Sequence, residues 1–277
     1  MIKAMFFDLD GTLLDASSQV SEGNRTALEA AKAEGLLLGL STGRDVNSVR
    51  EQLKKDWQLE GLIDLVVGSG GAEVYDARKD TTREYHFLEG ALIQEVMAHF
   101  ADMDVNFAIP WQGELVAPRD DAHIQMLSEA DRVPYRVEDF DEFLQTPKPK
   151  VMIVCAPETM PAVVERARTF ESDRYKSAAL QTASILYEYM DPTISKPEGI
   201  RHAVEEDDIE MEEIATFGDA DNDWEMTACA GFGIAMGNGS EKTKSVADLI
   251  TADHVHDGVA EGIYAVLRRN QEERENG

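Results

Sequence analysis

Two acidic segments of the sequence have the residue types and spacing to hold a metal ion. Asp8 and Asp10 follow an apolar segment near the start of the chain, and Gly11 after them permits a sharp turn. The segment 219–223 carries three further aspartates and follows the apolar run 214–217 after one glycine, Gly218. Each segment alone is also compatible with an acidic turn or a helix cap. Because ligands bind beyond the carboxyl ends of strands in an open α/β sheet, two such strand ends favour a shared hard cation, and oxygen ligands favour Mg²⁺.

This acidic group needs positive partners before it can bind an anion. The four candidate carboxylates are Asp8, Asp10, Asp219 and Asp223. A bound phosphate would add about two more negative charges at neutral pH. One Mg²⁺ offsets part of this charge, and a lysine is the expected complement. Lys196 stands where the alternation of strands and helices resumes, although a lone lysine is usually a solvated side chain.

A third segment, Ser41-Thr42-Gly43-Arg44, follows the apolar run 36–40. A hydroxyl and backbone N–H groups at the start of a helix suit phosphate oxygens. For this segment alone, a plain capping turn is the alternative. Together with the acidic segments, it indicates a phosphate site beside a metal.

The elements that must position these residues alternate at both ends of the chain. Apolar runs separated by helical segments imply crossover connections and a parallel sheet. From about Thr81 onward, prolines interrupt mixed segments, and the runs 151–156 and 185–190 are typical of antiparallel strands. The sequence therefore predicts a doubly wound, Rossmann-like α/β core made of residues 1–80 and 190–277. An α+β cap domain is expected to be inserted at 81–189.

Capping residues locate several helices of this arrangement. Ser21 is a suitable N-cap and Gly35 a suitable stop for the first helix, and Asp45 can cap the second. Pro161 suits the first position of a third helix. The expected helices span 22–34, 46–56, 161–171 and 199–206.

In this order, the segments resemble the motifs of the haloacid dehalogenase-like (HAD) phosphohydrolases, and in particular the Cof-type sugar phosphatases with a IIB cap. The matching residues are Asp8-Leu9-Asp10-Gly11-Thr12, Thr42-Gly43-Arg44, Lys196 and Gly218-Asp219-Ala220-Asp221-Asn222-Asp223, followed by similarity at Ala235-Met236-Gly237-Asn238 and on to Val259. The resemblance covers the whole core and extends to the cap only by position and length. Four ordered motifs are far more specific than any one of them.

The resemblance implies a role for each motif. Asp8 would be the nucleophile that forms an aspartyl-phosphate, and Asp10 the general acid and base. Thr42 and Lys196 would hold phosphoryl oxygens. The further phosphate contacts that it implies come from Gly11, Gly43, Arg44 and Asn222.

The resemblance also implies how Mg²⁺ would be held. Its ligands would be the Asp8 carboxylate, the Asp10 backbone carbonyl and Asp219. Asn222 and Asp223 would position or replace a water ligand.

Three positions depart from the family pattern. Gly70 stands where an asparagine is usual, so a side-chain amide near the site is missing. Pro197 replaces the usual glycine after Lys196, and His254 stands where asparagine is common. The departures leave the pair Asp8 and Asp10 intact.

The expected function is hydrolysis of small soluble phosphate monoesters, with substrate choice set by the cap. A phosphosugar mutase similar to the phosphomannomutases is an alternative, because the cap carries Arg119, Arg132, Arg136, Arg166, Arg168 and Arg174. A non-catalytic phosphate-binding protein on the same scaffold is another. Four cap residues could face the substrate: Trp111, Glu114, Asp120 and Asp121. For Trp111, ordinary packing within the cap is the simpler expectation.

Composition limits the possible partners. The 277 residues include 54 acidic and 26 basic ones, a net charge of −28. Such a surface repels nucleic acids and anionic membranes, and no strongly basic patch offsets it.

The two cysteines, Cys155 and Cys229, are far apart, which argues against disulfides or a zinc site. We expect a cytoplasmic protein that binds a small phosphorylated substrate; the sequence leaves its oligomeric state open.

Overall fold

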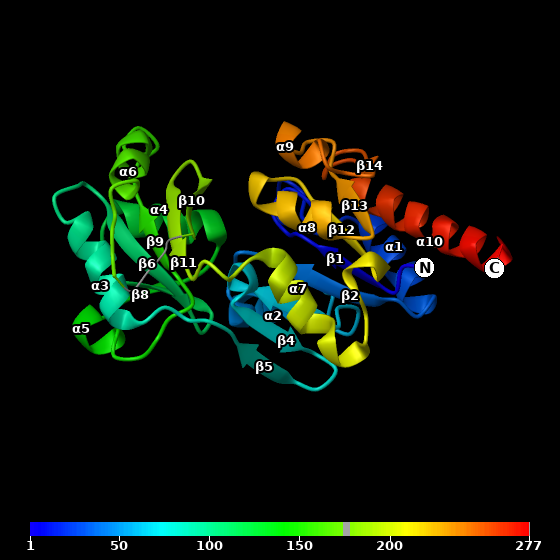
Figure 1. Ribbon diagram of the computed structural model, residues 1–277, viewed down its shortest axis with the longest axis horizontal. Helices are drawn as coiled ribbons and strands as arrows, with labels where there is room; N and C mark the ends of the chain where they lie inside the picture. Colours follow the sequence, from blue (N-terminus) through cyan, green and yellow to red (C-terminus); the bar gives the residue numbers. More distant parts are fainter. Residues whose placement is uncertain (174–177, 277) are drawn as a thin grey trace. The chain divides into compact units, whose positions relative to one another are not determined.

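The structure is a computed structural model that describes residues 1–173 and 178–276, and its contacts divide the chain into two units (Figure 1). The core unit consists of Met1–Gly43, Val49–Arg83 and Ser195–Gly277. The insert unit consists of Arg44–Ser48 and Glu84–Ile194. Each unit has its own sheet.

The core sheet carries the strands β1 (Ala4–Phe7), β2 (Leu37–Ser41), β3 (Leu65–Gly68), β4 (Glu73–Asp76), β5 (Thr81–Glu84), β12 (Ile214–Gly218), β13 (Phe232–Ala235) and β14 (Leu249–Ile250). The helices that accompany it are α1 (Glu22–Ala33), α2 (Val46–Lys55), α7 (Lys196–Val204), α8 (Trp224–Cys229), α9 (Glu241–Lys244) and α10 (Gly258–Asn276).

The order of the core strands is β14-β13-β12-β1-β2-β3-β4-β5. Pairing is parallel from β14 to β3, and β4 adds to β3 in the antiparallel sense. The chain builds outward from β1 through β2 and β3, then returns and builds the other way through β12. The expected doubly wound α/β fold is therefore confirmed. The change of direction between β1 and β12 is the switch point where such sheets bind ligands.

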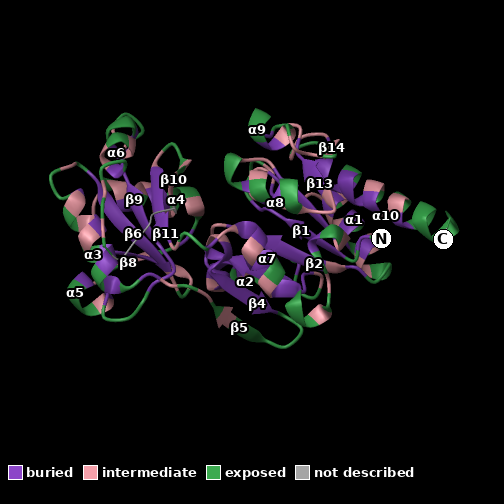
Figure 2. Cartoon of the chain, in the orientation of Figure 1, coloured by how far each residue is buried: buried purple, intermediate pink, exposed green. Residues whose placement is uncertain are grey.

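The alternation of side chains along the strands assigns the helices to the two faces of the core sheet. Phe217 on β12 stacks on Phe7, and Gly262 of α10 packs on the Phe217 ring. The neighbouring Thr216 points the other way and donates to the Met226 carbonyl of α8. Successive strand residues alternate between faces, so α10 and α8 cover opposite faces. β1 is buried along its whole length as a result (Figure 2).

The insert unit contains β6 (Asn106–Trp111), β7 (Glu114–Ala117), β8 (Tyr135–Val137), β9 (Val151–Val154), β10 (Ala178–Ala183) and β11 (Leu186–Met190), with helices α3 (Gly90–His99), α4 (Ala122–Asp131), α5 (Phe140–Phe143) and α6 (Met160–Ala167). Its strand order is β10-β11-β9-β6-β7-β8. The two runs predicted as antiparallel strands form β9 and β11, and these strands pair with each other in the antiparallel sense, with Tyr187 opposite Ile153.

Two of the expected helices agree with the structure at their starts. The Ser21 hydroxyl accepts from the Asn24 amide at the start of α1, and Gly35 follows the helix with φ +81°. The Asp45 carboxylate accepts from the Asn47 and Ser48 amides at the start of α2. Both caps use local hydrogen bonds, which explains why the sequence predicted them.

For the other two predicted helices, one boundary of each was wrong. The predicted helix 161–171 ends at Ala167, because the chain tightens into turns that bring Phe170 onto the Tyr189 ring. The helix predicted from Gly199 begins at Lys196, because the Ser195 hydroxyl caps it and accepts from the Glu198 amide. Pro197 is tolerated in the first turn, where its missing N–H costs nothing.

Candidate active site

Asp8 stands directly after β1, at the switch point of the core sheet. Its backbone N–H donates to the Phe217 carbonyl of β12, so the two strands fix the start of the loop. Its side chain is nearly fully buried. The Lys196 ammonium donates to Asp8 Oδ1 at 2.6 Å. The nucleophile candidate and the predicted lysine therefore meet, although they are far apart in the sequence.

Three carboxylates form a compact group at this point. Asp8, Asp219 and Asp223 each offer an oxygen, and these oxygens lie within 4.8 Å of one another. Carboxylate oxygens at this separation match the donor preference of a hard divalent cation, so the residues present fit Mg²⁺. This brings together three of the four aspartates predicted from the sequence.

Asp223 is the most heavily hydrogen-bonded member of the group. Its Oδ1 accepts from the Lys196 ammonium at 2.5 Å, and its Oδ2 accepts from the Asp219 and Ala220 amides at 2.9 Å each. Asp223 thus ties the lysine to the loop that carries Asp219. Asn222, next to it, is exposed.

The three-carboxylate group carries more negative than positive charge, and burial together with this imbalance shifts pKa values within it. Burial, together with the neighbouring Asp223, raises the pKa of Asp219 to about 6. Burial also raises the pKa of Asp8 well above its usual range, although Lys196 opposes the shift. For Lys196, burial alone would lower the pKa, but the Asp223 and Asp8 carboxylates outweigh it and raise the pKa. One lysine does not offset three carboxylates, of which Asp8 and Asp223 are buried and Asp219 is half-buried.

Lys196 is positioned by the turn that follows β3. An added Cβ at Gly71 would lie 2.3 Å from the Ser195 carbonyl oxygen, and Gly71 has φ +119°. Only glycine permits this approach and this backbone conformation. The segment 69–71 therefore packs directly against the residue that caps α7 and precedes Lys196. Gly70, the expected departure from the family pattern, lies in this turn, and its N–H donates to the Thr42 carbonyl.

The segment predicted to bind phosphate lies at the end of β2. Thr42 is buried, and its backbone N–H donates to the Val67 carbonyl at 2.9 Å. A phosphate would therefore meet the Thr42 hydroxyl rather than its amide. Gly43 is the last residue of this segment in the core unit. Arg44 belongs to the insert unit, where its guanidinium donates to the Asp131 carbonyl at 3.1 Å.

Asp10 and Gly11 form the loop after Asp8. The Asp10 side chain is exposed, and among the described residues it lies outside the three-carboxylate group. Gly11 has φ +85°, and an added Cβ there would lie 2.5 Å from Asp219 Oδ2. The loop thus passes directly against the Asp219 carboxylate.

Thr12 and Asn238 position Asp219, although no role for either was predicted from the sequence. The Thr12 hydroxyl donates to Asp219 Oδ1 at 2.9 Å. Asn238 donates from Nδ2 to the Gly11 carbonyl at 2.8 Å, and its Oδ1 accepts from the His254 amide at 3.0 Å. Asn238 follows β13, the neighbour of β12 in the sheet, so the rule that sites gather at carboxyl strand ends could have identified it.

The candidate cap residues have partners within the insert unit. Trp111 packs against Phe143 and Phe87, as expected for ordinary packing. The remaining three are engaged as follows: Glu114 pairs with Arg136, Asp120 accepts from Tyr135, and Asp121 caps α4.

The family assignment follows from sequence comparison. A family model described as haloacid dehalogenase-like hydrolase matches residues 5–263. The chain belongs to this family, as its motifs suggested, and it is a HAD-like phosphatase.

Two of the similar proteins are named as phosphatases, and a third is a longer protein named for another activity. The chain is 28% identical over 260 residues to the 5-amino-6-(5-phospho-D-ribitylamino)uracil phosphatase YitU of Bacillus subtilis, covering 91% of this chain and 93% of that one. It is 30% identical over 278 residues to a chloroplastic endoribonuclease, YBEY, of Arabidopsis thaliana; the match covers 94% of this chain but spans only 46% of that relative. A solved HAD subclass IIB sugar phosphatase superposes with a TM-score of 0.78 at 23% identity, over 95% of this chain and 98% of that one.

Two further expectations concern the whole chain. No helix in the described ranges, 1–173 and 178–276, is both long and apolar enough to cross a membrane. Cys155 is buried and Cys229 exposed, and both are free thiols.

Proposed function

We propose that this phosphatase is a Mg²⁺-dependent phosphomonoester hydrolase that works through an aspartyl-phosphate. The observation that carries the proposal is the contact of Lys196 with both Asp8 and Asp223 beside Asp219, at the switch point of the sheet. A nucleophile, a metal-ligand pair and a fixed cation within one buried group are what phosphoryl transfer requires.

Asp8, Asp219 and the Asp10 backbone carbonyl would hold the metal. When bound, Mg²⁺ supplies two positive charges that offset the carboxylates and the substrate phosphate. We assign Asp223 to positioning, because its oxygens accept from Lys196 and from the Asp219 and Ala220 amides.

The chain's own residues would carry the reaction in two steps. Asp8 attacks phosphorus, the ester P–O bond breaks, and Asp10 gives its proton to the departing alcohol. Asp10 then takes a proton from water, which attacks the aspartyl-phosphate and releases inorganic phosphate. Lys196 and the Thr42 hydroxyl hold phosphoryl oxygens during both steps.

Small phosphate esters, sugar phosphates among them, are the proposed substrates, and the insert unit is proposed as the cap that selects them. The subclass IIB sugar phosphatase with the same fold supports this substrate class. The hydrolase is favoured over a mutase because the similar proteins of comparable length are named as phosphatases. Four of the six arginines that raised the mutase alternative also form ion pairs, which a second phosphate group would have to displace. Their acidic partners are Asp121 for Arg119, Glu114 for Arg136, Asp102 for Arg166 and Glu165 for Arg168. Arg174 lies outside the described residues.

Replacing the nucleophile tests the mechanism. Asp8→Asn should reduce kcat by roughly a thousandfold or more, because an amide cannot form the aspartyl-phosphate. Release of inorganic phosphate from a panel of sugar phosphates with Mg²⁺ is the measurement, with circular dichroism as the check of folding. Asp221→Asn, an exposed neighbour in the other acidic segment, should keep its activity. Full activity in a folded Asp8→Asn protein would rule out the assignment.

A further inference from the structure

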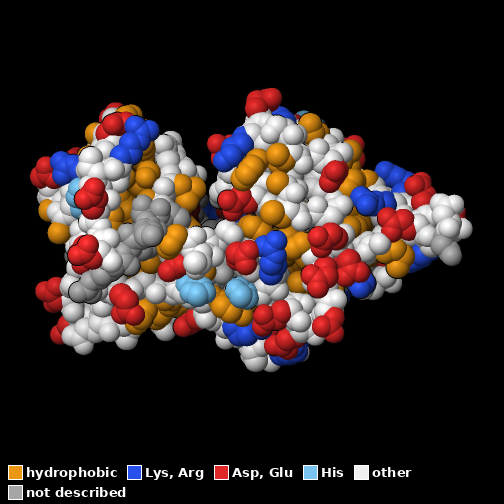
Figure 3. Space-filling model, viewed as in Figure 1, with side chains coloured by type: hydrophobic (Ala, Val, Ile, Leu, Met, Phe, Trp, Pro, Cys, Tyr) orange, Lys and Arg blue, Asp and Glu red, His pale blue; other side chains and the backbone are white. Residues whose placement is uncertain are grey.

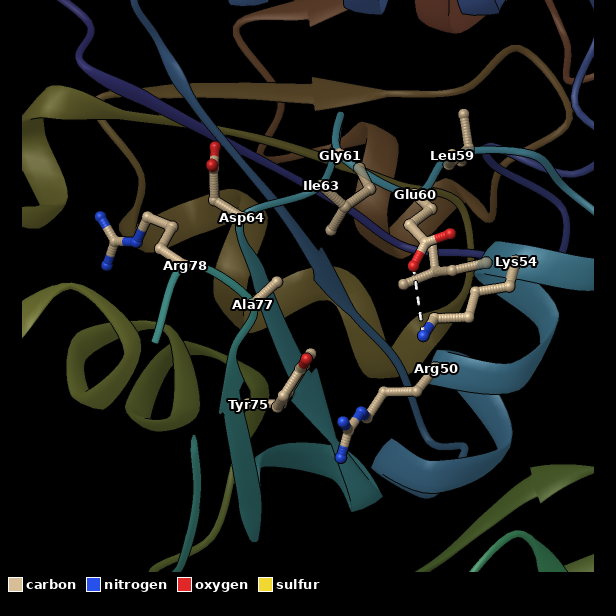
Figure 4. A pocket seen from close by; sticks show the side chains of 11 residues that line it. Arg50, Lys54, Leu59, Glu60, Gly61, Ile63, Asp64, Tyr75, Ala77 and Arg78 are labelled. Carbon is tan, nitrogen blue, oxygen red and sulfur yellow. Dashed lines mark ion pairs between the residues drawn. The ribbon is translucent and has the colours of Figure 1, made fainter. Parts of the chain in front are cut away.

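The core unit contains a hollow that the proposed reaction does not use. It has a volume of about 330 Å³, within the range of small-molecule pockets. Its walls come from α2, from the segment 59–64 and from the end of β4 (Figure 4). Ile63 and Asp64 precede β3, whereas Asp8 follows the parallel strand β1. The pocket therefore lies at the opposite end of the sheet from the acidic group.

The inner wall of this pocket is apolar. Leu53 of α2, together with Leu59 and Ile63, presents aliphatic side chains that are almost fully buried. Tyr75 and Ala77 contribute from the β4 side. Because Leu53, Leu59 and Ile63 are already nearly closed to solvent, an apolar ligand would gain by covering the parts of the lining that remain accessible.

Two cations stand at the α2 side of the pocket. Arg50 and Lys54 are one helical turn apart, and Figure 4 shows both extending from α2 beside the pocket. Arg50 lies 4.1 Å from the Tyr75 ring centroid and donates to Asp80 Oδ1 at 2.7 Å. Lys54 pairs with Glu60 at 3.1 Å.

The carboxylates that hold these two cations are replaceable. The Asp80 and Glu60 side chains are 74% and 65% exposed, and exposed ion pairs contribute little to stability. Asp80 also accepts from the Tyr75 hydroxyl, a hydrogen bond that a ligand would leave in place. The third cation of the wall differs, because Arg78 is held by both Asp76 and Asp207.

The remaining acid of the wall does not make this a cation site. Asp64 is buried and already accepts from Lys32 and from the Leu38 amide. That leaves Arg50 and Lys54 as the groups able to exchange partners. A ligand carboxylate could pair with Arg50 and Lys54 in place of the Asp80 and Glu60 side chains, which are also carboxylates. The apolar body of the ligand would then lie against the apolar wall.

We propose that this pocket binds a small organic carboxylate, with Arg50 and Lys54 on the carboxylate and Leu53, Leu59 and Ile63 on the apolar body. On a chain of net charge −28, two cations beside an apolar hollow are a favourable place for an organic anion. The site goes beyond the phosphatase activity and does not depend on its mechanism.

Calorimetric titration of the full chain with 2-naphthoate, in Mg²⁺-free buffer, tests the proposal. We expect saturable binding at one site. Acetate, which has the charge alone, and 2-naphthylmethanol, which has the apolar body alone, should each bind at least about tenfold more weakly. Absence of saturable 2-naphthoate binding, or acetate binding of equal strength, would overturn the proposal.

Variants on α2 locate the site. The double variant Arg50→Gln/Lys54→Gln should weaken 2-naphthoate binding about tenfold or more. Lys55→Gln is the matched control, because Lys55 lies on the same helix, pairs with Glu51 and does not line the pocket. Equal weakening in both proteins would contradict the assignment. Both should keep their phosphatase activity, which checks the fold.

Hydrogen exchange provides a readout that needs no variant. On adding 2-naphthoate, amides of the segment 59–64 should gain protection, and those of 219–223 should not. Protection at 219–223 without protection at 59–64 would place the ligand at the acidic group and overturn the proposal.

Discussion

The Asp219 carboxylate combines two opposing demands. It must be charged to hold a metal, yet it is largely buried beside Asp223, and its pKa is raised to about 6. Between about pH 4 and pH 6, the folded metal-free protein keeps a proton on Asp219 that the unfolded chain releases. The folded state is therefore stabilised by this group as the pH falls, and loses that contribution as the pH rises through 6.

Removing this charge should stabilise the metal-free protein. Near pH 7.5, Asp219→Asn should raise Tm without Mg²⁺, because it removes a buried and repelled charge while its Oδ1 still accepts from Thr12. Near pH 5 the gain should shrink, because Asp219 of the unaltered protein is then mostly protonated. Thermal unfolding at both pH values is the measurement.

Mg²⁺ and a neighbouring residue provide the controls for Asp219. Added Mg²⁺ should raise Tm of the unaltered protein and leave that of Asp219→Asn unchanged. Asp221→Asn, exposed in the same segment, should behave like the unaltered protein. A lower Tm for Asp219→Asn near pH 7.5 would contradict the electrostatic account.

The turn after β3 illustrates how one element depends on another. Gly71→Ala would place Cβ 2.3 Å from the Ser195 carbonyl, and we expect it to cost about 2 kcal/mol or more through strain and displacement. Because Ser195 caps the helix that begins with Lys196, kcat should fall as well. Urea unfolding and steady-state kinetics measure the two effects.

Gly35→Ala is the matched control for this turn. Gly35 also has positive φ, but an added Cβ there meets nothing within 4 Å. It should cost only the backbone strain, about 1 kcal/mol, and leave kcat unchanged. If the two variants were equally destabilised and equally active, close packing of Gly71 on Ser195 would not matter.

What the sequence could predict depended on how local each interaction is. The caps at Ser21 and Asp45 involve residues two or three positions apart, so the starts of α1 and α2 followed from spacing alone. The end of α6 depends on Phe170 reaching Tyr189, which is distant in sequence. The start of α7 is an exception, because its Ser195 cap is as local as that of Ser21 and yet was missed. The spacing of apolar residues in the sequence marked neither the end of α6 nor the start of α7.

The same limit applies to the site. Asp8, Asp219 and Lys196 stood out because they follow apolar runs in an order that matched known motifs. Asn238 and Gly71 act through contacts with residues distant in sequence, such as Gly11 and Ser195. Their roles needed the sheet order and the backbone geometry.

For the molecule as a whole, the dominant property is the net charge of −28. Figure 3 shows acidic side chains spread over the face in view, with basic side chains interspersed. Most of these acids lie outside the site and repel one another across the surface.

Added salt should therefore stabilise the protein. Raising NaCl from about 0.1 M to about 1 M shortens the screening length from about 10 Å to about 3 Å, which weakens the repulsion between surface charges. We expect Tm to rise over this range, measured without Mg²⁺ so that metal binding does not contribute. A fall in Tm would mean that the attractive pairs, such as Arg78 with Asp207, outweigh the excess negative charge.

The position of β1 in the sheet has a consequence for the order of folding. One edge of β1 pairs with β2, which begins at Leu37, whereas the other edge pairs with β12, which begins at Ile214. During synthesis, β1 therefore keeps an unpaired edge until β12 (Ile214–Gly218) has emerged. Closing so long a loop is slow, so Asp8 and Asp219 come together late, and premature release of the chain leaves an aggregation-prone strand edge.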